Sequence, residues 1–189
     1  MSSASRTVVI VGGVAGGMST ATRLRRLDET ARIIVVERSG HVSFANCGLP
    51  YHVGGVIEAR SALLLQTPAS LGARFGLDVR VRTEAVAIDP AAHRVTLRDL
   101  ASGVEEEVTY DALVLSPGAR PVRPPIPGIE RALTLRDLED TDVLVAAVAA
   151  AQGVEARGFD DESPEPATAV VIGGGFIGVE LTEIGRASC

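Results

Sequence analysis

The sequence contains no lysine, only two cysteines, and no apolar run longer than nine residues. We attribute the absence of lysine to the base composition of the gene and draw no chemistry from it. The net charge of −6 argues against a general nucleic-acid binder, because phosphate binding needs a basic surface. The longest apolar run, Val143–Ala151, is too short to cross a bilayer, so we predict no membrane partner.

The two cysteines, Cys47 and Cys189, stand far apart in the chain. A disulfide scaffold needs more pairs in a shorter chain, so we expect reduced thiols and a cytoplasmic protein. A length of 189 residues, 46% of them hydrophobic, fits a globular chain of one domain, or one domain and part of another. No metal site is predicted.

A β-α-β unit opens the chain. Thr7–Val11 is an apolar run typical of a buried parallel strand, residues 18–28 form a helical segment, and Arg32–Glu37 is a second apolar strand ending in an acid. The intervening glycines let the backbone approach a pyrophosphate, and the helix N-terminus attracts that anion. Glu37 stands where an acid would accept ribose hydroxyl hydrogen bonds. We predict a dinucleotide site, although Val14 replaces the second glycine of the usual motif and a ligand-free turn is the alternative.

A second glycine motif follows 161 residues after the first. The apolar run Ala169–Ile172 predicts a strand, and residues 173–178 (GGGFIG) are a complete G-x-G-x-x-G that opens a helix. The alternative is again a turn without a ligand. Two dinucleotide sites in one chain indicate two cofactors and a redox relay between them.

Between the motifs, residues 52–77 have a mixed pattern that predicts no element. Alternating patterns then predict an antiparallel meander of three strands, which we place at Asp78–Ile88, Arg94–Leu100 and Glu105–Tyr110. The elements expected after the meander are a buried strand at Ala112–Leu115, a proline-rich linker at Arg120–Gly128, a helix at Asp140–Gln152 and an exposed acidic loop at Asp160–Pro166.

Cys47 lies just after the first nucleotide unit, in the stretch Ser43–Tyr51 (SFANCGLPY). A lone cysteine is more often an inert buried thiol. Its polar neighbours Ser43 and Asn46, and the irregular glycine-proline turn after it, favour an exposed thiol instead. Because no partner cysteine stands nearby, a redox-active Cys47 would take its second sulfur from a substrate or be oxidised to a sulfenic acid.

Helix periodicity places Ser19, Arg23 and Arg26 within an arc of about 60°. Ala21 and Leu24 lie away from this arc and can pack inward. The non-functional interpretation is a helix face exposed to solvent. The functional interpretation is a docking surface for a phosphate-bearing thiol, because the planar guanidinium of arginine bonds two phosphate oxygens at once.

A family resemblance is carried by VVIVGGVAGGMSTATRLRRLD, RIIVVER, VSFANCGLPYHVGG, YDALVLSPGARP, TLRDLEDTD and VVIGGGFIGVE. These blocks resemble the coenzyme A-disulfide reductases, in the single-cysteine branch of the pyridine nucleotide-disulfide oxidoreductases. The likeness is strongest to the subgroup with a C-terminal rhodanese domain, which acts on CoA disulfides or persulfides. Val14 is usual in this branch. NADH peroxidases of the family have a histidine at the position of Ala15, which disfavours peroxide chemistry here.

The resemblance implies FAD and NAD(P)H as cofactors, Cys47 as the catalytic nucleophile and a homodimer at full length. The implied FAD positions are Gly12, Val14, Ala15, Gly16, Gly17, Glu37, Arg38, Ser116 and Gly118. The implied NAD(P)H positions are Gly173, Gly175, Phe176, Ile177, Gly178 and Glu180. The implied CoA contacts are Ser19, Arg23, Arg26, Ser43 and Asn46. The choice between NADH and NADPH stays open.

We therefore expect an α/β fold. A Rossmann-like FAD-binding domain with an antiparallel β-meander covers residues 1–120, a crossing segment and helix cover 121–150, and a truncated start of a second Rossmann-like, NAD(P)-binding domain covers 151–183. Residues 184–189 can be encoded by the start of a widely used sequencing adapter, so we expect this tail to be non-native.

The expected function is a flavoprotein that passes electrons from NAD(P)H through FAD and Cys47 to CoA disulfide, or to a CoA or low-molecular-weight persulfide. One alternative is a water-forming NADH oxidase that cycles Cys47 through sulfenic acid. Another is a redox-sensing flavoprotein without turnover. We expect the 189-residue chain alone to be an inactive N-terminal fragment.

Overall fold

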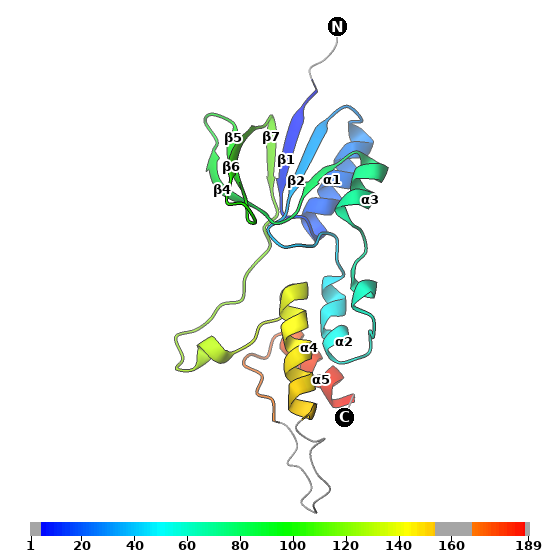
Figure 1. Cartoon of the computed structure of the whole chain (residues 1–189), viewed down its shortest axis with the longest axis vertical. Helices are drawn as coiled ribbons and strands as arrows, with labels where there is room; N and C mark the ends of the chain where they lie inside the picture. Colours follow the sequence, from blue (N-terminus) through cyan, green and yellow to red (C-terminus); the bar gives the residue numbers. More distant parts are fainter. Residues whose placement is uncertain (1–4, 154–167, 188–189) are drawn as a thin grey trace, which may run out of the picture. The chain divides into compact units, whose positions relative to one another are not determined.

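The computed structural model describes residues 5–153 and 168–187. The chain divides into two compact units (Figure 1). The first contains Met1–Phe44 and Leu64–Ala119, and the second contains Ala45–Leu63 and Arg120–Cys189. None of the helices in the described ranges combines the length and apolar character needed to cross a membrane.

The first unit is built on a parallel sheet with strand order β3-β2-β1-β7. Its strands are β1 (Thr7–Val11), β2 (Arg32–Val36), β3 (Asp78–Arg80) and β7 (Ala112–Leu115). Two helices, α1 (Ala15–Leu27) and α3 (Pro68–Phe75), lie on one side of this sheet in Figure 1. On the other side lies the antiparallel meander of β4 (Thr83–Asp89), β5 (Arg94–Asp99) and β6 (Glu105–Thr109).

Two apolar layers explain why the central strands carry unbroken apolar runs. Successive strand side chains point to opposite faces of a sheet. The layer against α1 and α3 includes Val8, Ile10, Ile33, Val35, Met18 and Leu71. The layer against the meander includes Val9, Ile34, Val36, Val95, Leu97 and Val108. Burying each such side chain contributes about 1.5–3 kcal/mol, so both faces of β1 and β2 stabilise the unit.

The predicted strand over Asp78–Ile88 was wrong as a single element. The structure divides it into β3, which pairs in parallel with β2, and β4, which pairs antiparallel with β5. Arg82, between them, has a φ of 51°, in the left-handed region. The alternating pattern runs through this break because both strands are half-buried, and only the tertiary pairing separates them.

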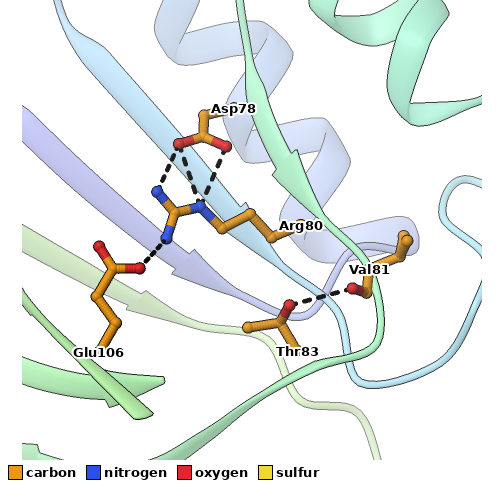
Figure 2. Close-up of polar contacts among 5 residues, drawn as sticks. All are labelled: Asp78, Arg80, Val81, Thr83 and Glu106. Atoms are coloured by element: carbon orange, nitrogen blue, oxygen red, sulfur yellow. Dashed lines mark hydrogen bonds and ion pairs between the residues drawn. The ribbon is translucent and has the colours of Figure 1, made fainter. Parts of the chain in front are cut away.

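Figure 2 shows the polar contacts around Arg80 and Thr83, one of which, between Arg80 and Glu106, joins β3 to the meander. Arg80 Nη2 donates to Asp78 Oδ2 at 2.8 Å, and Arg80 Nη1 donates to Glu106 Oε2 on β6 at 2.9 Å. These carboxylates raise the pKa of the Arg80 guanidinium, chiefly through the Asp78 hydrogen bond. The buried Thr83 hydroxyl donates to the Val81 carbonyl at 3.1 Å, where the chain leaves the parallel sheet. Arg80 therefore links the sheet edge to the meander.

Helix α3 falls in the region for which the sequence predicted no element. It begins with a capping box. The Thr67 side chain accepts a hydrogen bond from the Ser70 backbone N–H, and the Ser70 side chain accepts one from the Thr67 backbone N–H. Arg25 of α1 holds its other end, since Nε donates to the Phe75 carbonyl at 2.7 Å and Nη2 to the Gly76 carbonyl at 3.1 Å. The short helix is thus stabilised by its caps and by α1.

The second unit contains short helical segments. They are η1 (Asn46–Gly48), α2 (Leu49–Val53), η2 (Arg60–Leu63), η3 (Ile129–Arg131), α4 (Leu138–Gly153) and α5 (Phe176–Ala187). The helix α2 packs against α4 and α5. Arg60 of η2 forms a two-armed ion pair with Asp142 of α4, with Nε–Oδ1 at 2.6 Å and Nη2–Oδ2 at 2.8 Å. This pair ties the segment after α2 to α4.

The helix predicted over Asp140–Gln152 is confirmed as α4, which begins two residues earlier. The strand predicted over Ala169–Ile172 is wrong, since these residues form no strand. A parallel strand needs neighbours to accept its backbone hydrogen bonds, and no strand among the described residues pairs with this segment. The predicted acidic loop at Asp160–Pro166 and the residue Cys189 lie outside the described residues.

Candidate functional site

The first glycine turn is fixed by two close backbone approaches. Gly12 has a φ of 104°, and a Cβ there would overlap the carbonyl oxygen of Ser116. A Cβ on Gly17 would in turn overlap the carbonyl oxygen of Gly12. Only glycine at both positions lets the strand end, the turn and α1 pack this tightly.

The N-terminus of α1 is open to an anion. The helix begins at Ala15, three residues earlier than predicted, and Val14 at the N-cap makes no side-chain cap hydrogen bond. No acidic residue stands in the first turn. The first N–H groups and the positive end of the helix dipole therefore suit a phosphate, and this fits the predicted pyrophosphate site.

Glu37 is held against the glycine turn. Its Oε2 accepts from the backbone N–H of Gly13 at 2.8 Å, and its Oε1 accepts from that of Ser39 at 2.8 Å. A carboxylate has about four lone-pair sites, so acceptor capacity remains for the predicted ribose contact. Gly13 was missed as a site residue, although the doubled glycine after β1 was the available signal.

Other predicted residues of the first unit gather at the same turn. The Ser116 N–H donates to the Val11 carbonyl at 2.7 Å, and the Ser116 side chain faces Gly16. The Ser43 N–H donates to the Gly13 carbonyl at 2.9 Å. Ser43 has a φ of 50°, which is strained for a residue with a side chain and recurs at functional loops.

Two predicted FAD positions lie on the surface. Gly118 is exposed and has a φ of 70°. The Arg38 guanidinium is exposed and lies 3.9 Å from the Glu84 carboxylate. This pair contributes little to stability, and Arg38 stays accessible to a ligand.

The arginine face of α1 is accessible to solvent. Ser19, Arg23 and Arg26 are exposed, whereas Ala21 is buried and Leu24 packs against the core. The predicted direction of this face is therefore confirmed. Its exposure fits both a solvated surface and a phosphate-docking surface, so its role stays a prediction.

Cys47 is exposed, so the interpretation as a buried thiol is wrong, and its reactivity stays a prediction. It lies in η1, which leads directly into α2. The adjacent Gly48 lies close to Leu63, and a Cβ there would come within 2.8 Å of the end of the Leu63 side chain. Leu49 and Pro50 are buried, and they anchor the segment while the thiol is exposed.

The second glycine turn repeats the geometry of the first. Gly173 has a φ of 109°, and a Cβ on Gly178 would lie 2.8 Å from the Gly173 carbonyl oxygen. The helix α5 begins at Phe176, the same motif position at which α1 begins. Phe176 is 94% exposed. The turn and the helix start predicted for a second nucleotide site are therefore present, but the strand predicted before them is not.

Sequence reasoning missed one residue near Cys47. Tyr51 lines the same cleft as Glu180, and interaction with the Glu180 carboxylate raises the pKa of the Tyr51 phenol. The cleft has a volume of about 560 Å³. Its lining residues are Tyr51, Val56, Phe176, Val179, Glu180, Glu183 and Ile184. The two residues lie on α2 and α5, so sequence spacing gave no signal for their proximity.

The predicted site residues divide between the two units. The first unit holds the FAD positions together with Ser19, Arg23, Arg26 and Ser43. The second unit holds Asn46, Cys47 and the predicted NAD(P)H positions at residues 173–180.

Similarity to known proteins is extensive. Coenzyme A disulfide reductase of Staphylococcus aureus strain JH9 is 36% identical over 178 residues, which cover 93% of this chain and 37% of that protein. The chain thus spans little more than a third of the length of these curated relatives.

Solved structures agree with this similarity. Reduced CoADR-RHD of Bacillus anthracis matches with a TM-score of 0.87 and 47% identity, over 97% of this chain and 31% of that one. An NAD-dependent persulfide reductase from A. fulgidus matches with a TM-score of 0.82 and 36% identity, over 96% and 32%. A water-forming NADH oxidase from Lactobacillus brevis matches with a TM-score of 0.84 and 27% identity, over 97% and 38%.

These likenesses confirm the predicted α/β fold and the resemblance to the coenzyme A-disulfide reductases. The family described as pyridine nucleotide-disulphide oxidoreductase matches residues 6–188, nearly the whole chain. The predicted cofactors, FAD and NAD(P)H, are those of this family. The chain therefore belongs to the pyridine nucleotide-disulphide oxidoreductases.

Proposed function

We propose that this chain is the cofactor-binding and thiol-bearing part of an enzyme that reduces CoA disulfide, or a CoA or low-molecular-weight persulfide, with NAD(P)H. The observation that carries the proposal is the exposed Cys47, set in a chain that is 36% identical to a coenzyme A disulfide reductase. The similarity to a persulfide reductase supports the persulfide as a second acceptor.

The residues of the chain have separate tasks. The first glycine turn, the α1 N-terminus and Glu37 would hold FAD, and the turn at residues 173–178 would hold NAD(P)H. Bound FAD and NAD(P)H would supply the electron pair. The exposed arginines of α1 would bind CoA phosphates, since guanidinium groups pair with phosphate oxygens.

Cys47 performs the sulfur chemistry. Its thiolate attacks one sulfur of CoA disulfide, so that a Cys47–CoA disulfide bond forms and the original disulfide bond breaks. The released CoA thiolate takes up a proton from water. An electron pair and one proton then cleave the mixed disulfide, release the second CoA thiol and restore the Cys47 thiolate.

The central experiment replaces Cys47 with serine in the protein that carries this chain. We expect Cys47→Ser to retain FAD, because the glycine turn and Glu37 lie in the other unit, but to lose NAD(P)H-dependent reduction of CoA disulfide. FAD absorbance and NAD(P)H consumption are measured on the same sample. Undiminished turnover in the variant would overturn the proposal.

A second experiment tests the CoA surface. We expect the double variant Arg23→Met/Arg26→Met to raise KM for CoA disulfide about tenfold or more, because charge-assisted contacts are lost. KM for pantethine, a disulfide without the CoA phosphates, should stay unchanged. Arg32→Met, an exposed arginine outside the α1 face, is the matched control.

Similarity to a water-forming NADH oxidase favours a second candidate function. In that reaction Cys47 would pass through a sulfenic acid and the enzyme would consume oxygen without any disulfide. Oxygen uptake with NADH alone, abolished by Cys47→Ser, would select this function over disulfide reduction. A redox sensor would instead show no steady NAD(P)H consumption with either acceptor.

A further inference from the structure

Residues 45–63 of the second unit, which we call the Cys47 loop, form a loop that is closed at its base. The Ala45 N–H donates to the Leu63 carbonyl at 2.9 Å, so the two ends of the loop meet. A Cβ on Gly48 would come within 2.8 Å of the Leu63 side chain, so the two arms of the loop also pack against each other. The thiol lies in the first arm, and the second arm ends in η2.

The helix within the Cys47 loop needs support from other parts of the unit. An isolated helix needs about 12–15 residues to be marginally stable in water, whereas α2 has five. Its buried residues are Leu49 and Pro50. The helix packs against α4 and α5, and Figure 1 shows it beside α4. The conformation of the loop therefore depends on how firmly it is docked on these helices.

The first turn of α4 is fixed by its own side chains. Asp137 Oδ1 accepts from the Asp140 N–H at 2.9 Å, and Asp140 Oδ2 accepts from the Thr134 hydroxyl at 2.8 Å. Leu138 and Thr141 in the same turn are completely buried. The stretch TLRDLEDTD, which contains this turn, holds none of the predicted cofactor or CoA positions, yet it provides a firmly held support beside α2.

Asp142 joins this support to the Cys47 loop. Its Oδ1 accepts from Arg60 Nε at 2.6 Å, and its Oδ2 accepts from Arg60 Nη2 at 2.8 Å. The two-armed contact fixes orientation as well as distance, because the planar guanidinium matches both carboxylate oxygens. The two side chains are 35% and 45% exposed, so the pair contributes little to the stability of the whole fold. Its effect is local to the loop and α4.

We propose that Arg60 and Asp142 are a pair of positioning residues, whose ion pair docks the Cys47 loop on α4 and thereby holds the Cys47 sulfur in place for reaction. This inference rests on the proposed function of Cys47 as the redox thiol. Both residues act through the loop and not on the reacting sulfur. Without the pair, the loop leaves α4 more often, and a displacement of about 1 Å can slow a reaction about a hundredfold.

The test compares variants of the full-length protein that carries this chain. Arg60→Met and Asp142→Asn should each lower kcat for CoA disulfide about threefold to tenfold, whereas KM should change less than about twofold, because orientation is lost and substrate binding is not. Arg60→Lys keeps the charge but loses the planar fork, so its kcat should lie in between. The double variant Arg60→Met/Asp142→Asn should be no slower than the slower single variant, because both changes remove one pair.

Amide hydrogen exchange is a second measurement, and it needs neither NAD(P)H nor CoA disulfide. In Asp142→Asn, the amides of Ala45 and Ile57, which are bonded within the Cys47 loop, should exchange about threefold faster or more. The Asp140 amide, which is bonded within α4, should exchange at an unchanged rate. A general weakening of the second unit would accelerate exchange at all three amides.

Two controls isolate the pair. Arg98→Met removes an exposed ion pair of similar length, with Nη2–Oε1 at 2.6 Å, that lies in the meander and should leave kcat unchanged. Glu139→Gln removes another carboxylate of α4 that acts on Arg60 through its charge, and it should lower kcat less than Asp142→Asn. Circular dichroism and FAD absorbance check that each variant is folded and loaded. If Arg60→Met does not fold, Arg60→Lys replaces it.

The proposal is overturned if the loop amides of Asp142→Asn keep their exchange rates, or if kcat is unchanged in a protein that reduces CoA disulfide. A rise in KM without a fall in kcat, or a fall in activity that follows FAD content, would also overturn it. Faster exchange confined to the loop of a protein that reduces no CoA disulfide would refute the proposed function and leave the docking pair standing.

Discussion

Gly12 and Gly173 open two turns of nearly the same shape, with φ angles of 104° and 109°, and a helix begins three residues after each. The segments that lead into these turns differ. Thr7–Val11 is hydrogen-bonded to strands on both sides, whereas Ala169–Ile172 forms no strand. Val9 is completely buried and Val170 is 82% exposed.

Local interactions and long-range strand pairing therefore determine different parts of the motif. The glycine turn and the helix start depend on local backbone freedom and on residues near in sequence, so both motifs form them. A strand depends on partners that donate and accept its backbone hydrogen bonds.

Gly17→Ala against Gly178→Ala is the most direct comparison. Alanine in place of glycine normally favours a helix by about 1 kcal/mol. At Gly17 the added Cβ would overlap the Gly12 carbonyl where α1 packs against the end of β1, so we expect a net loss of about 3 kcal/mol in the free energy of unfolding. At Gly178 the contact is 2.8 Å and the turn is exposed, so the change should stay within about 1 kcal/mol. Denaturant unfolding measures both, and equal losses would contradict the comparison.

Glu37→Gln tests what completes the first motif. The amide can accept only one of the two backbone hydrogen bonds from Gly13 and Ser39, so we expect a loss of about 2 kcal/mol in unfolding free energy. FAD should also be retained less well. Unfolding curves and FAD content after dialysis measure the two effects. Glu84→Gln, which removes a carboxylate of the same unit that pairs weakly with Arg38, is the control and should leave both unchanged.

Arg80→Met tests the link between the parallel sheet, which carries the first glycine turn, and the meander. The Arg80 side chain is only 23% exposed, so losing its contacts with Asp78 and Glu106 should reduce the unfolding free energy by about 1–2 kcal/mol and speed amide exchange in the meander. Arg98→Met is the matched control. The Arg98–Glu105 pair is exposed and lies within one hairpin, so its loss should cost less than about 0.5 kcal/mol. Similar losses in the two variants would show that Arg80 does not link the layers.

Ser43→Gly should give the smallest effect and the opposite sign. Glycine relieves the positive φ at Ser43 but increases the freedom of the unfolded chain, which leaves a gain of about 0.5 kcal/mol. Ser39→Gly, where the φ angle is not positive and a hydroxyl bonds the His41 carbonyl, should instead lose stability. Thermal unfolding of both variants measures the difference. A destabilised Ser43→Gly would show that the serine side chain matters more than the strain.

Much of the first motif could be predicted because its signals are local. The apolar runs of β1 and β2, the glycines between them and the acid at Glu37 stand close together in sequence. The meander strands β5 and β6 were found for the same reason, since alternation and turn residues are adjacent. The helix α3 was missed because its caps, Thr67 and Arg25, come from a short motif and from a distant helix.

The candidate site could be predicted only in part. Cys47, the arginines of α1 and both glycine motifs were recognisable as residue types in a pattern. The proximity of Tyr51 to Glu180 was not, because these residues are 129 positions apart and lie on different helices. The division of Asp78–Ile88 into β3 and β4 could not be predicted either, because the alternation of apolar and polar residues there suits a strand in either sheet.

Local sequence set the backbone turns, the helix starts and the chemistry available at Cys47, because glycine, apolar periodicity and a thiol act at their own positions and on their nearest neighbours. Long-range packing fixed which strand joined which sheet, the exposure of the Cys47 thiol and the placement of Tyr51 and Glu180 in one cleft. These outcomes depend on long-range pairing and burial, which exist only after distant segments of the chain have packed together.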